Sequence, residues 1–124
     1  MEVKMKKYSK EHQWIEVMGN RGRMGITKFA SEQLGNIVYL ELPTVGDQTT
    51  ANEPMTIVES VKSSSDVYSP VSGEVVAVNE ELGDAPELLN EDPEGKAWIA
   101  EILLDNPVEL EDLMTEEEYF DFIK

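Results

Sequence analysis

Lys62 is the residue whose surroundings most clearly indicate chemistry. The stretch TIVESVKSSSDVYSPVSGEVV, residues 56–76, places this lysine between two apolar runs. From Phe29 through Gly95 it is the only basic residue of any kind. An accessible amine in such a position is a candidate for modification by another enzyme. The alternative at this point is an ordinary surface lysine that aids solubility.

The residues around Lys62 favour an amine that another enzyme must reach. The runs MTIV and VYSPV on either side are strand-like, which predicts that Lys62 lies at or beside the tip of a hairpin. A hairpin tip holds a side chain in solvent on a rigid support. Glu59 and Asp66 bracket the lysine, while Ser60 and the run 63–65 add little bulk. This surface can guide a modifying enzyme without blocking the amine.

Other candidate sites do not complete a motif. Residues 19–25, GNRGRMG, space their glycines as G-x-x-G-x-x-G and lack the Gly-Lys-Ser/Thr of a phosphate loop, so a hairpin turn explains them better. His12 is the only histidine and there is no cysteine, so we expect no metal site and interpret His12 as a surface or packing residue.

Composition restricts the class of protein. A chain of 124 residues fits a single domain over residues 1–124. Its formal net charge of −16 opposes binding to nucleic acid or to anionic lipid. The same charge suits docking onto basic protein patches, although solubility alone also explains it. No apolar run is long enough to span a bilayer and no signal peptide is present, so we expect a cytoplasmic protein.

The elements that must position Lys62 begin with a hairpin. Residues 13–18 read as a strand, Gly19-Asn20 as a tight turn and residues 21–26 as the partner strand. Thr27 is placed to N-cap a short helix near 28–34, which Gly35 ends. NIVYLELP, residues 36–43, then predicts a largely buried strand ended by proline.

Further short strands follow. They are predicted at 55–60, 66–71, 74–79 and 97–104, with a short turn at 85–90 and a β-turn at 92–95. Gly46 and Asn52 are candidates for positive φ, and Gly46 and Gly73 fit tight turns of a small sheet. We therefore expect a mainly β sandwich or barrel with helices only at its margins.

The C-terminal part, near 107–122, is predicted to be helical. Asn106 can cap the first helix, Pro107 suits its first position and Glu109 has capping-box spacing. Thr115 and Glu118 repeat that spacing before EYFDF.

Beyond these local patterns, the sequence resembles a known family. VESVKSSSDVYSPVSGEV closely resembles the lipoylation segment of the glycine cleavage system H protein family. The likeness continues in HQWIEV, GITKFASEQLGNIVYLELPTVGD, ELLNEDPEGKAW and EEYFDF, in the same order. The resemblance implies a barrel-sandwich hybrid fold, with lipoic acid joined to Lys62 as an amide. A biotin carrier is less similar, because Val61 and Ser63 replace the methionines usual beside a biotinyl lysine.

The resemblance also implies partners. Glycine decarboxylase, a pyridoxal-phosphate enzyme, would transfer an aminomethyl group to the lipoyl arm, and a tetrahydrofolate-dependent aminomethyltransferase would receive it. Dihydrolipoyl dehydrogenase would reoxidise the arm, and a lipoate ligase or a lipoyl/octanoyl transferase would attach it. The protein would then be a shuttling substrate of these enzymes rather than an enzyme.

Four further residues are expected at the cleft that holds the arm or in ligase recognition: Glu59, Asp66, Gln13 and Ser63. Gln13 departs from the family, which usually has glutamate there to help hold the charged arm. Asp66 matches a second family carboxylate, so we expect weaker holding of the arm rather than a dead carrier. Ala97 likewise stands where the family favours glycine.

Two other functions remain open on the sequence. A lipoate-relay protein would donate lipoate to other enzyme complexes without shuttling aminomethyl groups, and Gln13 is compatible with that role. An unmodified acidic binding module would carry Lys62 as an ordinary amine.

Overall fold

The computed structural model describes residues 5–124, so the first four residues of the predicted domain lie outside the described part. The strands are β1 Met5–Tyr8, β2 Gln13–Met18, β3 Arg21–Ile26, β4 Ile37–Leu40, β5 Gln48–Thr49, β6 Pro54–Ser60, β7 Ser64–Tyr68, β8 Gly73–Val78 and β9 Ala100–Leu104. The helices are α1 Lys28–Leu34, α2 Glu81–Asp84, α3 Leu88–Glu91, the 3₁₀-helix η1 Pro107–Asp112 and α4 Glu116–Phe122.

Two antiparallel sheets face each other across one main core. Within residues 5–124, the larger sheet has six strands in the order β1-β2-β3-β9-β8-β5, and the smaller has three in the order β4-β6-β7. Fully buried Ile15, Met24 and Ile102 come from the large sheet, while Val58 and Val67 come from the small one. Because strand side chains alternate between faces, β2, β3, β9, β6 and β7 each turn one row of side chains toward this core. The predicted mainly β, two-sheet fold is confirmed.

Several local predictions are confirmed residue by residue. The β2–β3 hairpin has the predicted bounds and turns at Gly19, whose φ is 67°. Thr27 caps α1 by accepting a hydrogen bond from the Ala30 amide, and Gly35 ends this helix with φ of 80°. Gly46 and Asn52 have positive φ, as expected. The amide of Gly95 donates to the Asp92 carbonyl, so residues 92–95 form the predicted turn.

The strand predicted over residues 36–43 is shorter and less buried than expected. β4 spans only Ile37–Leu40, and Val38 and Tyr39 are 53% and 49% exposed. The register with β6 shifts between Ile37 and Tyr39, which is the signature of a β-bulge. The extra residue breaks the alternation on which the buried-strand prediction depended, so both side chains face solvent.

The segment after β8 also differs from the prediction. Residues 85–90 are predicted to form a short turn, but the turn is confined to residues 86–87, since α2 ends just before this stretch and α3 begins at Leu88. Leu82 and Leu89 are fully buried, and these two leucines fix the short helices against the core. The strand β1 was likewise not predicted; its backbone pairs with β2, and Tyr8 also bridges to Met114.

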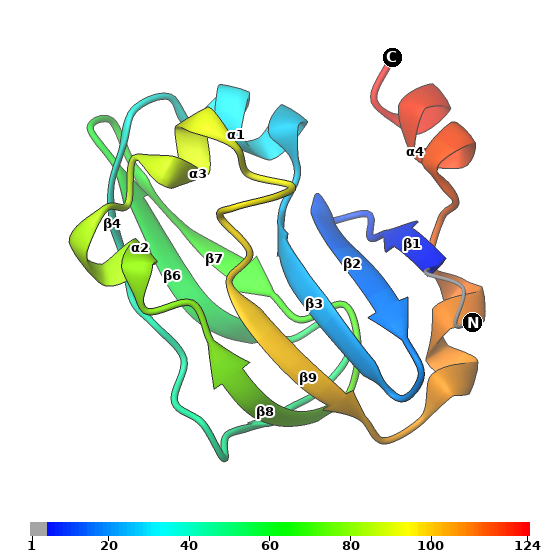
Figure 1. Cartoon of the computed structure of the whole chain (residues 1–124). Helices are drawn as coiled ribbons and strands as arrows, with labels where there is room; N and C mark the ends of the chain where they lie inside the picture. Colours follow the sequence, from blue (N-terminus) through cyan, green and yellow to red (C-terminus); the bar gives the residue numbers. More distant parts are fainter. Residues whose placement is uncertain (1–4) are drawn as a thin grey trace.

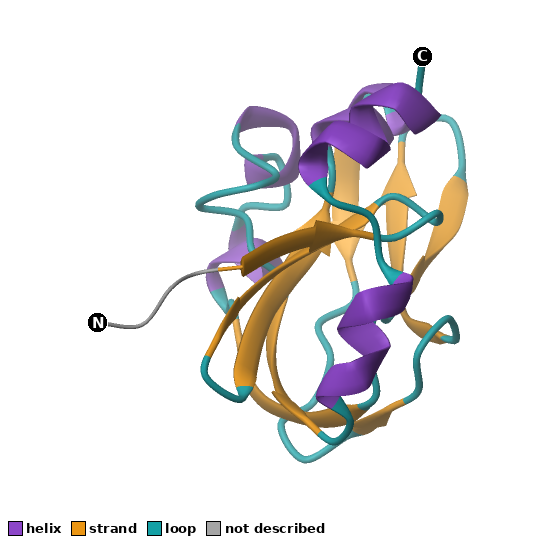
Figure 2. Cartoon of the chain, turned by 90° about the vertical axis from the view of Figure 1, so that its right-hand side faces the viewer, coloured by secondary structure: helices purple, strands orange, loops and turns teal. Residues whose placement is uncertain are grey.

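The C-terminal segment is helical, but one of its two predicted caps is wrong. Asn106 makes no capping side-chain hydrogen bond at η1. The Glu109 carboxylate instead accepts hydrogen bonds from the backbone amide and the hydroxyl of Ser72. Thr115 and Glu118 do form the predicted capping box of α4. Figure 2 shows η1 and α4 along one side of the strands.

Candidate functional site

Lys62 lies in the turn between β6 and β7 and is exposed. The turn is closed by a hydrogen bond from the Ser60 amide to the Ser63 carbonyl, at 2.8 Å. The buried Ser60 hydroxyl oxygen accepts hydrogen bonds from the Lys62 and Ser63 amides, at 3.3 and 3.2 Å. These bonds fix the backbone on both sides of the lysine, so its amine extends from an ordered support.

A second set of contacts holds this turn against the end of α1. The Val61 amide donates to the Asn36 carbonyl at 2.9 Å. Asn90 of α3 fixes the segment that carries Asn36, because its side chain donates to the Gly35 carbonyl and accepts from the Ile37 amide, each at 2.8 Å. Figure 1 shows the β6–β7 turn at the same end of the molecule as α1 and α3.

The Lys62 amine is available within the described structure. Among residues 5–124, its ammonium forms no ion pair with Glu59, Asp66 or any other carboxylate. Its Cε and Nζ would lie 3.5 and 3.9 Å from a Cβ added at Gly35, so the lysine side chain passes the end of α1 without being covered by it. An enzyme that acylates lysine can therefore approach this nitrogen.

A cleft begins next to this end of α1. Its volume is about 470 Å³. Phe29, Ala30, Gln33 and Leu34 of α1 form one wall, and Ser65 to Tyr68 of β7 form the other. His12 and Gln13 also line it. Because Leu34 directly precedes Gly35, a tether attached to Lys62 starts beside the cleft and can fold along it.

The structure brings together two of the four residues predicted around the arm. Gln13 and Asp66 line the same cleft. Glu59 pairs with Tyr39 on the outer face of the small sheet, and Ser63 lies in the turn itself. Neither Glu59 nor Ser63 lines the cleft, so any role of theirs concerns the approach of an enzyme to Lys62.

Gln13 is buried and both ends of its amide are paired. Its Nε2 donates to the Glu11 carbonyl at 2.8 Å, and its Oε1 accepts from the Ser9 hydroxyl at 2.8 Å. Asp66 is exposed and supplies a carboxylate to the cleft. Glu11 also lines the cleft, so the negative charge of the cleft comes from Asp66 and Glu11 rather than from residue 13.

His12 packs among aromatic rings and hydrogen-bonds to the C-terminal helix. Its Nδ1 lies 2.8 Å from the Tyr119 hydroxyl, and its ring centroid is 4.8 Å from that of Phe29. The interpretation of His12 as a packing residue is confirmed. Burial lowers the pKa of His12, and the Glu11 carboxylate partly offsets this effect.

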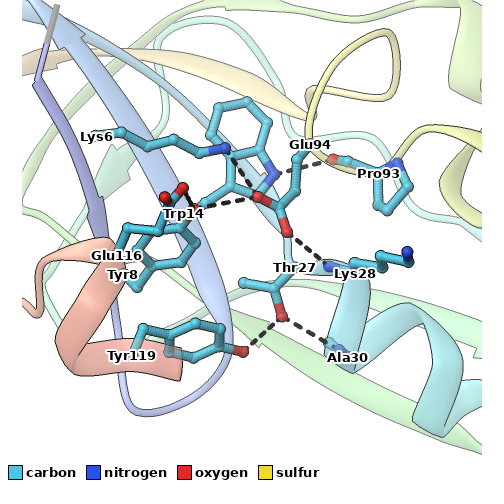
Figure 3. Close-up of polar contacts among 10 residues, drawn as sticks. All are labelled: Lys6, Tyr8, Trp14, Thr27, Lys28, Ala30, Pro93, Glu94, Glu116 and Tyr119. Atoms are coloured by element: carbon cyan, nitrogen blue, oxygen red, sulfur yellow. Dashed lines mark hydrogen bonds and ion pairs between the residues drawn. The ribbon is translucent and has the colours of Figure 1, made fainter. Parts of the chain in front are cut away.

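A partly buried polar network attaches α4 to the rest of the site (Figure 3). The Tyr119 hydroxyl lies 2.7 Å from Thr27 Oγ1, the capping atom of α1, and its ring stacks on Tyr8 with centroids 4.7 Å apart. Burial raises the pKa of both tyrosines, so both hydroxyls stay protonated near neutral pH. The Glu94 carboxylate accepts from Lys6 Nζ and from the Lys28 amide, at 2.8 and 2.9 Å. These bonds join α1, β1, the 92–95 turn and α4.

We expect the stability of the protein to fall as pH drops below the ordinary histidine range, partly because of His12. Its pKa is lower in the folded chain than in the unfolded chain, so its contribution is complete above the unfolded value of 6.5 and is lost as pH falls towards the folded value. His12→Asn is the informative variant, because asparagine tolerates the φ of 70° but does not titrate. Chemical unfolding between pH 7 and 5 should give a shallower pH slope for His12→Asn. The difference must stay below about 1.4 kcal/mol per pH unit, the limit for one proton, and identical slopes would contradict the assignment.

Sequence reasoning missed two residues that position the lysine. Ser60 was treated only as small, yet its hydroxyl organises the turn, and Asn90 had no predicted role. Ser60 acts locally, on amides two and three residues ahead, whereas Asn90 bonds to residues 53 and 55 positions away along the chain. The segment ELLNEDPEGKAW contains Asn90 and was already part of the family resemblance, which was the available signal.

Comparison with known proteins gives a consistent result. A family model described as "Glycine cleavage H-protein" matches residues 6–124. The glycine cleavage system H proteins of Carboxydothermus hydrogenoformans and Anoxybacillus flavithermus are 53% and 55% identical to the chain over 113 residues, which is 91% of this chain and 87% and 89% of theirs. The crystal structure of a glycine cleavage system H protein from Mycobacterium marinum superposes with a TM-score of 0.87 at 33% identity, covering 95% of both chains. No helix within residues 5–124 is long and apolar enough to cross a membrane.

Proposed function

The chain belongs to the glycine cleavage H-protein family, and from that premise we propose that Lys62 carries its lipoyl group. The function of the protein is that of the lipoyl carrier in the glycine cleavage system. The observation that supports Lys62 is its exposed amine on a hydrogen-bonded turn beside a cleft. The relatives compared above carry the glycine cleavage name, and they give no support to a lipoate relay.

The surroundings of Lys62 fit a lipoyl group. Extended, the lysine and lipoyl chain would reach on the order of 15 Å from the backbone. When bound, the group supplies a disulfide-containing ring whose sulfur carries the aminomethyl unit. Phe29 and Leu34 offer apolar surface for the hydrocarbon chain, and the Asp66 carboxylate offers a partner for a terminal cation.

The protein's own residues would then hold and present the arm without completing a reaction. Ser60 and Asn36 fix the turn, and the cleft shelters whatever Lys62 carries. We further propose that the partners are glycine decarboxylase, the aminomethyltransferase, dihydrolipoyl dehydrogenase and a lipoate ligase or lipoyl/octanoyl transferase. A cytoplasmic location stays a prediction.

Intact-mass measurement tests the attachment site. After expression with lipoate, the mass should rise by one lipoyl group, and peptide mapping should place it on Lys62. No increment would favour an unmodified acidic binding module, and an increment on another lysine would contradict the assignment.

Gln13→Glu is expected to slow hydrolytic loss of the aminomethyl group from the loaded arm. A carboxylate at residue 13 keeps the bond from Ser9 but loses the donor to Glu11, and it adds a negative charge to the cleft. Hydrogen bonds to charged groups contribute about 1.5–3 kcal/mol, and partial solvation reduces this, so we expect at least a threefold slower loss, on the order of 0.7 kcal/mol. The measurement follows release of the one-carbon unit from purified, loaded carrier. Gln33→Glu, on the α1 wall, is the control for added charge, and equal rates for Gln13→Glu and wild type would remove the hypothesis.

A further inference from the structure

Apolar side chains gather on the outer face of the small sheet, next to Lys62. Val38 and Tyr39 of β4, Ile57 of β6 and Val61 of the turn are 53%, 49%, 41% and 69% exposed. Val61 directly precedes the lysine, so this apolar surface reaches the attachment site. Exposed apolar side chains that cluster in this way mark an interaction site more often than isolated ones do.

The strand register places acids among these apolar residues. Ile57 pairs with Asp66 of β7 on one side, and its carbonyl accepts from the Glu41 amide on the other. Tyr39 pairs with Glu59. Because Lys62 is the only basic residue between Phe29 and Gly95, this face interleaves acidic and apolar side chains, and Glu59 lies between Ile57 and Val61 along the chain.

We propose that this face is the docking surface for glycine decarboxylase, the enzyme proposed above to load the lipoyl arm, and that the matching enzyme surface combines apolar side chains with lysine and arginine side chains. The proposal rests on the proposed function of Lys62 and assigns the surface through which that function is exercised. Complementary charge of this kind raises association rates and fixes the orientation of docking. A second copy of the chain fits poorly, because two such acidic faces repel.

The charge of Lys62 distinguishes an enzyme that uses the arm from one that attaches it. Before acylation the ammonium opposes a basic surface, and acylation removes that cation from the edge of the face. The acylated carrier therefore suits a basic partner better than the unmodified one. An attaching enzyme with the same basic surface would retain its product, so we assign the face to an enzyme that uses the arm.

The test uses the full chain in its lipoylated form and glycine decarboxylase holoenzyme as the probe. A newly lipoylated carrier is in the oxidised state that this enzyme requires, so it can be assayed directly. Tyr39→Ser/Ile57→Ser should raise the KM for the carrier about tenfold with little change in kcat, since a few central contacts dominate an interface. Val108→Ser is the control: its side chain is 64% exposed, on η1, and its KM should match wild type. Direct binding to the enzyme should show a similar loss of affinity for the double variant. Wild type should bind more weakly at high salt, and its lipoylated form should bind more tightly than its unmodified form.

The outcomes separate this proposal from the proposed function. Absence of a lipoyl group on Lys62 would overturn the proposed function, while binding by the unmodified carrier still tests the face. Equal KM and affinity for the double variant, the Val108→Ser control and wild type would overturn the docking surface. A dimer that sedimentation detects in wild type but not in the double variant would assign the face to a second copy and also overturn it.

Discussion

A Lys62→Arg variant is expected to support glycine cleavage only at the background rate of the assay. Arginine keeps the positive charge and most of the length of lysine, but its guanidinium is always protonated and has no nucleophilic amine to acylate. The backbone of the turn should remain intact, because the bonds that close it involve Ser60, Ser63 and Asn36 rather than the lysine side chain. The loss of activity should therefore be complete, and it should come from the missing amine rather than from a change in the fold.

Two readouts make this result specific. Reconstitution with the partner enzymes measures glycine-dependent reduction of NAD, and intact mass measures the lipoyl group on the same sample. Lys96→Arg is the matched control, since Lys96 is also exposed and is the next lysine along the chain. It should be lipoylated and active. Residual activity of Lys62→Arg above background, or a lipoyl group on it, would show that another residue carries the arm.

The fold was predictable where neighbouring residues determine it. The Thr27 cap, the Gly35 stop and the turn at Gly19 each depend on a few adjacent residues, and all are present. The capping box of Thr115 and Glu118 is equally local. Asn106 and Glu109 have the same spacing, but the Glu109 carboxylate accepts hydrogen bonds from Ser72 instead. A long-range hydrogen bond replaced the local one, and spacing cannot foresee that competition.

At the candidate site, too, the features set by neighbouring residues were predictable and those set by the fold were not. The exposed position of Lys62 in a turn was predictable from the strand-like runs on either side of it. The placement of Gln13 and Asp66 on one cleft came only from family resemblance, because 53 positions separate them and the fold alone brings β2 and β7 together. The β4 bulge, which turns both Val38 and Tyr39 outward, has no local signature, so the apolar face beside Lys62 could not be predicted.

Gly73 shows how a residue can be singled out correctly for the wrong reason. It was expected to allow a tight turn, but it begins β8, pairs with Thr49 and Leu104, and lacks a left-handed φ. Its real constraint is space. A Cβ at this position would lie 2.1 Å from the Leu103 carbonyl oxygen and 2.7 Å from Ile102 Cγ2. Because the nearer atom belongs to the backbone of β9, a side-chain rotation cannot relieve the clash.

Gly73→Ala is accordingly expected to destabilise the fold by about 3 kcal/mol, near the upper end of what overpacking in a core costs. For a chain of 124 residues that corresponds to a fall of roughly 10 °C in Tm. Urea unfolding and thermal scans measure both quantities. Gly83→Ala is the control: a Cβ there would meet only Leu42 Cδ1 at 3.4 Å, an ordinary contact. In helix α2 that alanine should be neutral or stabilising by up to about 1 kcal/mol. If Gly73→Ala were as stable as Gly83→Ala, β8 and β9 would have to separate at little cost, and the close approach of these strands could not be what requires glycine at position 73.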